Sequence, residues 1–132
     1  RHTLFPYTTL FRSIKVRQIV HQETRIEQYS LIIFDFNTSE ISDHNRQILD
    51  IVRESIEPNS KVTIQGYTDR TGDIEYNKQL SQKRANAIAK ALNIDKSRAK
   101  GVGNSVLLFP NNTPEGRFYC RTVRITIETP LE

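Results

Sequence analysis

The sequence predicts an α/β fold of the α+β sandwich type, with two long helices packed on one face of a small mixed sheet. Two long segments carry apolar residues at helical spacing, and short runs rich in β-branched and aromatic residues lie before, between and after them. A capping residue precedes each helical segment. The predicted order is β-α-β-α-β-(short helix)-β, which leaves one face of the sheet to the helices.

The first strand and the first helix are expected between residues 30 and 57. Residues 30–36, SLIIFDF, form a compact apolar run that is typical of a buried strand. Ser42 is the expected N-cap of the helix, and the acidic Asp43 suits the positive end of the helix dipole. The helix should end before Pro58, because a residue that precedes proline resists the α conformation.

A second strand and a second long helix follow. Residues 61–67, KVTIQGY, alternate apolar and polar side chains, and Gly66 indicates a bend or a close approach of another backbone. The turn-forming residues TDRTGD lead to Asp73, the expected cap of a helix from residue 74 to about residue 92. This helix is rich in alanine, which allows close packing on a sheet.

The C-terminal part of the chain supplies two more strands and a short helix. A short strand is expected at residues 100–103. In TPEGR, Thr113 is the expected cap of a helical turn with Pro114 at its first position. Residues 121–128, RTVRITIE, alternate strictly, which predicts a half-buried strand.

The chain is expected to divide into four segments. Residues 3–13, TLFPYTTLFRS, are the uninterrupted translation of a widely used sequencing-library adapter, so residues 1–13 are expected not to be native. Without Arg1 and Arg12, Lys and Arg fall from 19 to 17 against 15 acidic residues, and the net charge falls from +4 to +2. Residues 14–29 are a linker, a frayed tail or the last strand of a missing upstream domain, residues 30–129 one domain, and residues 130–132 a tail.

Composition argues against several function classes. Cys120 is the single cysteine, and no ligand cluster for a metal or cofactor is evident. No apolar run approaches the roughly 20 residues of a membrane-spanning helix. His21 and His44 belong to no recognisable catalytic motif, so no enzyme is expected. The lysine-rich flank of the second helix is expected to be a solvated face rather than a nucleic-acid site.

Two charged residues stand out between residues 67 and 85. Asp69 lies in the turn after the second strand, and Arg84 lies in the second helix. Leu80, Arg84 and Ile88 are spaced four residues apart, so Arg84 interrupts an apolar stripe. A buried arginine needs a carboxylate or a ligand. The pair could therefore hold a small zwitterion, or form an internal salt bridge that orients the loop.

Five short motifs follow one another along the chain. They are FDFN at residues 34–37, GYTDRTG at 66–72, NKQLSQKRA at 77–85, GVG at 101–103 and TPEGR at 113–117. With these motifs, residues 29–129 resemble the OmpA-like C-terminal domain. This is the peptidoglycan-binding module shared by outer-membrane protein A, the peptidoglycan-associated lipoprotein and the flagellar stator protein MotB.

The resemblance implies a non-catalytic module that binds the stem peptide of peptidoglycan. Its ligand would be the free end of meso-diaminopimelate, a carbon that carries both an ammonium and a carboxylate. Asp69 would take the ammonium, and Arg84 would take the carboxylate through a fork of two hydrogen bonds. The resemblance implies no cofactor and no metal.

Four further site residues are carried over from the motifs. Thr68, Asn77 and Leu80 would shape the pocket, and Asn37 would lie in the loop that faces it. The alternative for Asn77 is a structural role, in which it ties the turn to the helix.

The resemblance also implies a periplasmic location associated with the outer membrane. Attachment to the membrane would come only from a missing upstream region, whether a barrel, a lipid or a transmembrane helix, and no oligomeric state is predicted. Where the family has Asn-Arg-Arg near the last strand, this chain has Cys120, Arg121 and Thr122. A cysteine can fill the space of asparagine but cannot make its hydrogen bonds. The alternative function is a protein-interaction module that kept the fold without affinity for peptidoglycan.

Overall fold

One mixed sheet organises the molecule. The computed structural model describes residues 7–11, 14–21, 23–31, 34, 39–107 and 111–131. In chain order, its elements are β1 (Tyr7–Phe11), β2 (Ile14–His21), β3 (Thr24–Leu31), α1 (Asp43–Ser55), β4 (Lys61–Tyr67), α2 (Ile74–Leu92), the 3-10 helix η1 (Lys96–Arg98), β5 (Ala99–Gly103), α3 (Pro114–Cys120) and β6 (Val123–Pro130). Among these helices, none is both long and apolar enough to cross a membrane.

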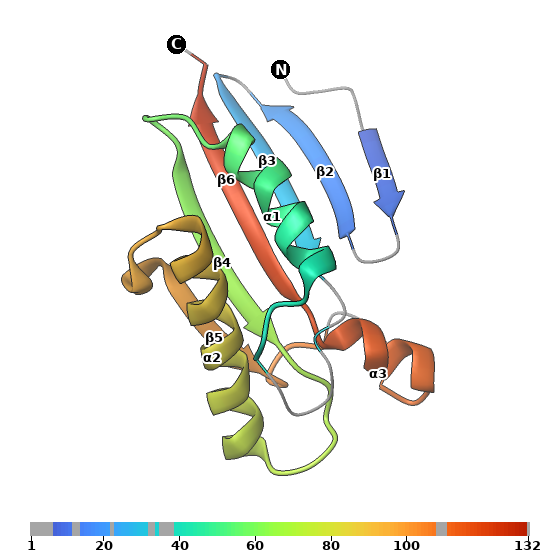
Figure 1. The fold of residues 1–132 in the computed structure, drawn as a ribbon. Coiled ribbons are helices and arrows are strands. Elements are labelled where there is room, and N and C mark those ends of the chain that lie inside the picture. The colour runs from blue at the N-terminus through green and yellow to red at the C-terminus, as the bar shows by residue number, and fades with distance from the viewer. Residues whose placement is uncertain are drawn as a thin grey trace.

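The sheet has the strand order β1-β2-β3-β6-β4-β5. Strands β4 and β5 are parallel, and the other neighbours are antiparallel. Figure 1 shows α1 and α2 on the same face of the sheet, with α2 over β4 and β5. The four strands β3, β6, β4 and β5 with these two helices confirm the predicted fold class and the position of both helices.

Both long helices begin at the predicted caps. The backbone N–H of Asn45 donates to Ser42 Oγ at 3.1 Å, and the backbone N–H of Tyr76 donates to Asp73 Oδ2 at 2.8 Å. Helix α1 ends three residues before Pro58. Helix α2 ends at the left-handed residue Asn93, a common way to close a helix. The helix boundaries are therefore set by local chemistry.

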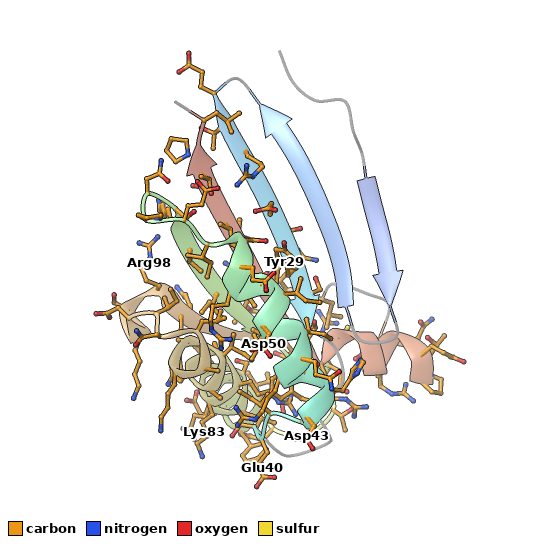
Figure 2. All side chains as sticks on the ribbon, turned by 45° about the horizontal axis from the view of Figure 1, so that its top comes forward. Tyr29, Glu40, Asp43, Asp50, Lys83 and Arg98 are labelled. Carbon is orange, nitrogen blue, oxygen red and sulfur yellow. The ribbon has the colours of Figure 1, made fainter. Side chains whose placement is uncertain are left out.

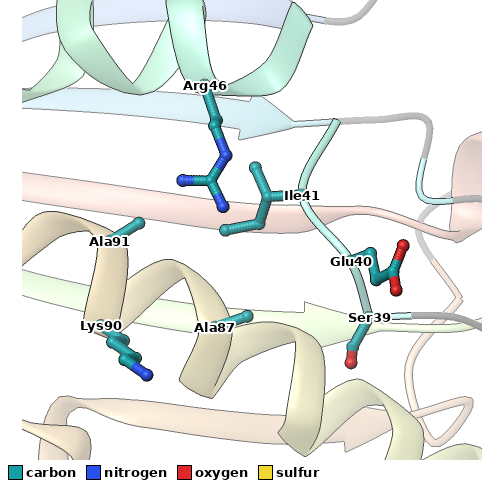
Figure 3. A pocket seen from close by; sticks show the side chains of 7 residues that line it. All are labelled: Ser39, Glu40, Ile41, Arg46, Ala87, Lys90 and Ala91. Atoms are coloured by element: carbon teal, nitrogen blue, oxygen red, sulfur yellow. The ribbon is translucent and has the colours of Figure 1, made fainter. Parts of the chain in front are cut away.

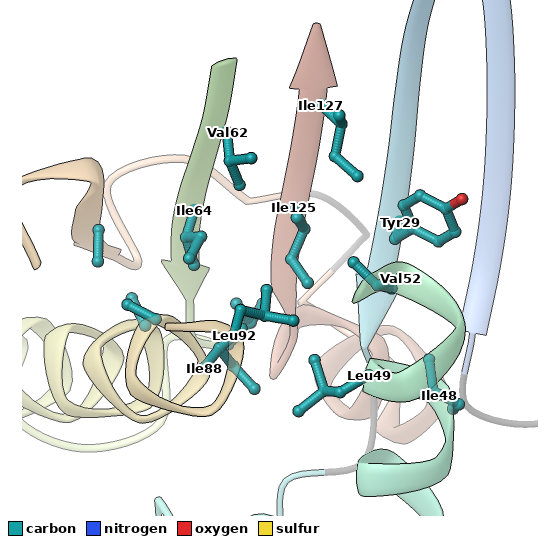
Figure 4. Packing of buried hydrophobic residues seen from close by; sticks show 14 of the residues in the cluster. Tyr29, Ile48, Leu49, Val52, Val62, Ile64, Ile88, Leu92, Ile125 and Ile127 are labelled. Carbon is teal, nitrogen blue, oxygen red and sulfur yellow. The ribbon is translucent and has the colours of Figure 1, made fainter. Parts of the chain in front are cut away.

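The core lies between the sheet and the two helices. Strand β6 contributes its alternate residues Val123, Ile125 and Ile127, all fully buried. Figure 4 shows Ile125 and Ile127 facing the side chains of both helices. On the outer side of the helices, Figure 2 shows the exposed side chains of Asp43 and Lys83. The alternation predicted for β6 is confirmed, with the strand shifted to Val123–Pro130.

The strand predicted at residues 30–36 is described only in part: residues 30 and 31 belong to β3 (Thr24–Leu31), Phe34 lies in no strand, and the other four residues lie outside the described part of the chain. Its register with β6 runs from Thr24 opposite Pro130 to Leu31 opposite Val123. The helix-covered side of β3 carries Glu27 and Tyr29, both buried, so a charged residue interrupts the apolar pattern of this strand in the sequence.

Tyr29 explains how a polar residue fits the covered side of β3. Its hydroxyl lies 2.9 Å from Ser55 Oγ of α1 and donates to Glu27 at 3.5 Å. These partners satisfy the hydroxyl in the core, so a polar side chain can occupy a position that pattern reasoning reserves for apolar ones.

Helix α2 packs unusually close to β4 and β5. A Cβ added to Gly66 would lie 2.2 Å from the carbonyl oxygen of Ser81, and one added to Gly101 would lie 2.3 Å from the backbone nitrogen of Gln82. Ser81 Oγ accepts a hydrogen bond from the backbone N–H of Gly103 at 2.9 Å. The close approach expected at Gly66 is confirmed, and it fixes α2 against strands β4 and β5.

Candidate functional site

A small pocket lies where the loop after β4 meets the N-terminal half of α2. Its volume is about 90 Å³, enough for a few water molecules or one small polar head group. Five of the six predicted site residues line it: Thr68, Asp69, Asn77, Leu80 and Arg84. The sixth, Asn37, lies outside the described residues. Thr71, Gly72, Tyr76 and Arg121 complete the lining.

Asp69 provides the negative charge of the pocket. It is only 5% exposed, and its Oδ1 accepts a hydrogen bond from the backbone N–H of Thr71 at 2.8 Å. The hydrogen bonds found among the described residues do not use Oδ2. The backbone N–H of Thr68, one residue earlier, donates to the carbonyl oxygen of Gly103. The carboxylate is therefore held by the turn while one oxygen is left for another donor.

Asn77 ties this turn to α2. Its Nδ2 donates to the carbonyl oxygen of Thr71 at 2.9 Å and to that of Asp69 at 3.4 Å. These two bonds are the structural role that the sequence offered as an alternative. Because Asn77 also lines the pocket, the tie fixes the distance between the loop wall and the helix wall.

Arg84 provides the positive charge on the helix wall. It is 1% exposed and is among the largest fully buried side chains. Its guanidinium carbon lies 5.2 Å from the centre of the Phe34 ring, a cation–π distance. Of the ion pairs between described residues, none joins Arg84 to Asp69, so the internal salt bridge between them is not observed.

Thr68 also lines the pocket, and its hydroxyl is unused. The residue is 3% exposed, and within the described part of the chain its Oγ1 has no hydrogen-bond partner. Buried hydroxyls are nearly always hydrogen-bonded in folded proteins. A polar ligand atom in the pocket would give this hydroxyl the partner that the protein does not supply.

Sequence reasoning did not identify four further pocket residues, and two of them, Tyr76 and Arg121, have large side chains. Tyr76 is 47% exposed at the mouth, and its spacing of four from Leu80 was the available signal. Arg121 belongs to the segment that departs from the family pattern. Its neighbours Cys120 and Thr122 are fully buried, so the altered segment packs inward and still brings a cation to the pocket.

A larger hollow lies elsewhere, between α1 and α2. It has a volume of about 540 Å³ and is lined by Ser39, Glu40, Ile41, Arg46, Ala87, Lys90 and Ala91. Figure 3 shows Arg46 and Lys90 on its opposite sides. Its three charged residues are all exposed, so they remain solvated and need no ligand. The smaller pocket, lined by the buried charges Asp69 and Arg84, is therefore the candidate functional site.

The chemistry of the buried pocket suits a zwitterion. The loop contributes a carboxylate and a hydroxyl to the lining, and the helix contributes a guanidinium. Charge-assisted hydrogen bonds are stronger than hydrogen bonds between neutral groups. A ligand with both charges can therefore make contacts here that a neutral solute cannot make. Over the part of the chain that the structure describes, no group of three or more His, Cys, Asp or Glu side chains could hold a metal ion.

Comparison with known proteins gives both sequence and structural relatives. Omp38 of Acinetobacter baumannii, an outer membrane protein, is 36% identical over 104 residues, which cover 73% of this chain and 29% of Omp38. The peptidoglycan-associated lipoprotein of Burkholderia pseudomallei is 26% identical with a TM-score of 0.66, covering 74% of this chain and 88% of that one.

A third similar structure is the cell wall anchor of the T6SS from Pseudomonas aeruginosa, with a TM-score of 0.67 and 20% identity over 85% of this chain and 86% of that one. At this identity the likeness shows the fold alone. The chain spans well under two thirds of the length of curated relatives such as Omp38. Residues 33–121 match the OmpA family along most of the chain. The chain belongs to the OmpA family.

Proposed function

We propose that this domain is a non-catalytic peptidoglycan-binding module. It anchors an envelope protein to the cell wall by gripping the diaminopimelate zwitterion of the stem peptide. The carrying observation is the pocket that places buried Asp69 and Arg84 on separate walls. Similarity to a peptidoglycan-associated lipoprotein supports the ligand, and similarity to outer membrane proteins supports a periplasmic location at the outer membrane.

The two charged ends of the ligand match the two walls. Arg84 binds the carboxylate through its planar fork, which fits carboxylate oxygens in pairs. Asp69 accepts from the ammonium through Oδ2, while Oδ1 remains bonded to the backbone of Thr71. Both protein charges are almost fully buried, so water screens these contacts little.

Two neutral residues fit the rest of the ligand head. The Thr68 hydroxyl accepts from the ammonium or donates to the carboxylate, which removes the cost of its buried and unpartnered state, about 1–3 kcal/mol. Leu80, half-buried on the same face of α2 as Arg84, packs against the methylene chain of diaminopimelate. The pocket therefore selects a zwitterion on an aliphatic stem.

Isothermal titration with meso-diaminopimelate tests this function. We expect Asp69→Asn and Arg84→Met each to weaken binding by about 1.5–3 kcal/mol, the usual loss for a hydrogen bond to a charged group. Arg70→Met is a matched control, because Arg70 is exposed in the same turn and is not among the lining residues. Circular dichroism checks that each variant is folded.

Two outcomes would reject the proposal. One is a folded wild-type domain that binds neither meso-diaminopimelate nor purified sacculi, which would favour the protein-interaction module. The other is unchanged affinity in both the Asp69 and the Arg84 variants.

A further inference from the structure

We propose that Tyr76 forms a second subsite, which contacts the stem-peptide backbone next to diaminopimelate. This inference rests on the proposed function, because it uses the zwitterion held at Asp69 and Arg84 as its reference point. The ligand of this subsite would be a peptide unit, whereas Asp69 and Arg84 bind a zwitterion.

Tyr76, Leu80 and Arg84 form a graded stripe along α2. They are four residues apart, so successive members lie one above another, about 6 Å apart along the helix axis. All three line the pocket, and their exposure rises from 1% at Arg84 through half-buried Leu80 to 47% at Tyr76. The pocket therefore has a closed end at Arg84 and an open end at Tyr76.

The loop wall also has an open position. Gly72 lines the pocket, and a Cβ built on it would have no neighbour within 4 Å. By contrast, Asp69 and Thr68 at the inner end are buried. Among the described lining residues, Gly72 on the loop and Tyr76 on the helix are both exposed, so a chain attached to the ligand head has room to leave the pocket past them.

The length of diaminopimelate places its peptide bonds near this exit. Its two α-carbons, each of which carries an amino and a carboxyl group, are separated by four carbon–carbon bonds, which span about 5 Å when extended. With the zwitterion at Arg84, the stem-linked carbon lies level with Leu80, about one helical turn away. The next peptide unit of the stem then reaches Tyr76, whereas free diaminopimelate is too short to extend past it.

A tyrosine suits a peptide unit. Its ring offers an apolar face to the flat amide, and its hydroxyl can donate to a carbonyl or accept from an N–H. The backbone of Tyr76 is fixed at the first turn of α2, where its N–H donates to Asp73, and its side chain has only two rotatable torsions. It can therefore provide contact area at a small cost in side-chain entropy.

Titration with two ligands isolates this subsite. The short ligand is meso-diaminopimelate, and the long one is the stem tripeptide that ends in it. We expect Tyr76→Ala to weaken tripeptide binding about fivefold, with little effect on free diaminopimelate. Tyr76→Phe should retain most tripeptide affinity if the ring supplies the contact. Ile74→Ala is the matched control, because Ile74 is an exposed apolar residue of the same helix turn that does not line the pocket.

The outcomes separate the two proposals. Equal effects of Tyr76→Ala on both ligands, or no effect on either, would overturn the second subsite while leaving the zwitterion site intact. Failure of the wild-type domain to bind free diaminopimelate would instead overturn the proposed function.

Discussion

Replacement of Gly66 by alanine would test whether the depth of α2 on the sheet sets the pocket. The new Cβ would lie 2.2 Å from the carbonyl oxygen of Ser81, whereas ordinary Cβ contacts begin at 3.4 Å. Both groups belong to backbone segments, so no side-chain rotation can relieve the contact. Helix α2 and strand β4 must therefore separate locally by about 1 Å, the difference between these two distances.

The same displacement would change the binding site. Asp69 follows β4 by two residues, and Arg84 follows Ser81 by three, so separation of the two elements moves the charges apart. Overpacking of this kind costs about 1–3 kcal/mol of folding free energy. A shift of about 1 Å also takes a charged hydrogen bond of about 2.8 Å beyond its range. We expect at least a tenfold loss of meso-diaminopimelate affinity, since one such bond contributes about 1.5 kcal/mol or more.

Urea denaturation and isothermal titration would measure the two effects on the same protein. Ile48→Ala is the control, because Ile48 is buried on α1 and its truncation costs about 2–5 kcal/mol without introducing a clash between α2 and β4. We expect this control to be destabilised with unchanged affinity. Wild-type affinity in Gly66→Ala, or equal losses in both variants, would refute the idea that helix depth sets the pocket.

Three other predictions concern the pocket, the core and the N-terminus. Thr68→Val should raise the unfolding free energy by about 1 kcal/mol, because it removes a buried unpartnered hydroxyl. The same variant should bind meso-diaminopimelate more weakly. Lower stability in thermal denaturation would contradict this prediction. Burial, opposed in part by the hydrogen bond to Ser55, raises the pKa of Tyr29 above its ordinary value of 10.0. The stability that comes from neutral Tyr29 is therefore complete below that pH and is lost as the pH rises through the folded pKa. In urea denaturation, the difference in unfolding free energy between wild type and Tyr29→Phe should therefore shrink above about pH 10. A difference that stays constant with pH would contradict this. A chain shortened to residues 14–132 should keep its melting temperature within a few degrees, because β1 pairs only with β2 at the sheet edge; loss of cooperative unfolding would show that residues 1–13 belong to the fold.

Elements with local signals could be predicted closely from the sequence. Helix α2 begins after Asp73 and ends at Leu92, as its cap and its apolar spacing predicted. Strand β4 has the predicted bounds, and Gly66 marks the predicted close approach. These features depend on residues within one helical turn or one strand, so the sequence pattern contains the necessary information.

Elements that depend on distant partners could not be placed in this way. Strand β3 buries Glu27 and Tyr29, and the Tyr29 hydroxyl is satisfied by Ser55, which is 26 residues away in the sequence. The apolar pattern therefore placed the strand at residues 30–36, of which residues 30 and 31 belong to β3. Only tertiary packing shows that a polar residue can belong to the core here.

In the candidate site, too, some features follow from local sequence spacing and others depend on tertiary packing. The spacing of Leu80, Arg84 and Ile88 predicted a cation within an apolar stripe, and Arg84 is buried as expected. The Phe34 ring beside its guanidinium and the unused Thr68 hydroxyl depend on how the loops pack, which spacing does not encode. The ligand roles of Asp69 and Arg84 remain predictions for experiment.

Titration with two stem tripeptides that differ only in the third residue would separate the two ends of the pocket. One tripeptide carries meso-diaminopimelate, and the other carries lysine, which lacks the distal carboxylate but keeps the ammonium. We expect the lysine peptide to bind more weakly by about 1.5–3 kcal/mol, because Arg84 loses its charged partner. In Arg84→Met this difference should disappear. Equal affinity of the wild-type domain for both tripeptides would contradict the role of Arg84 as the carboxylate receptor.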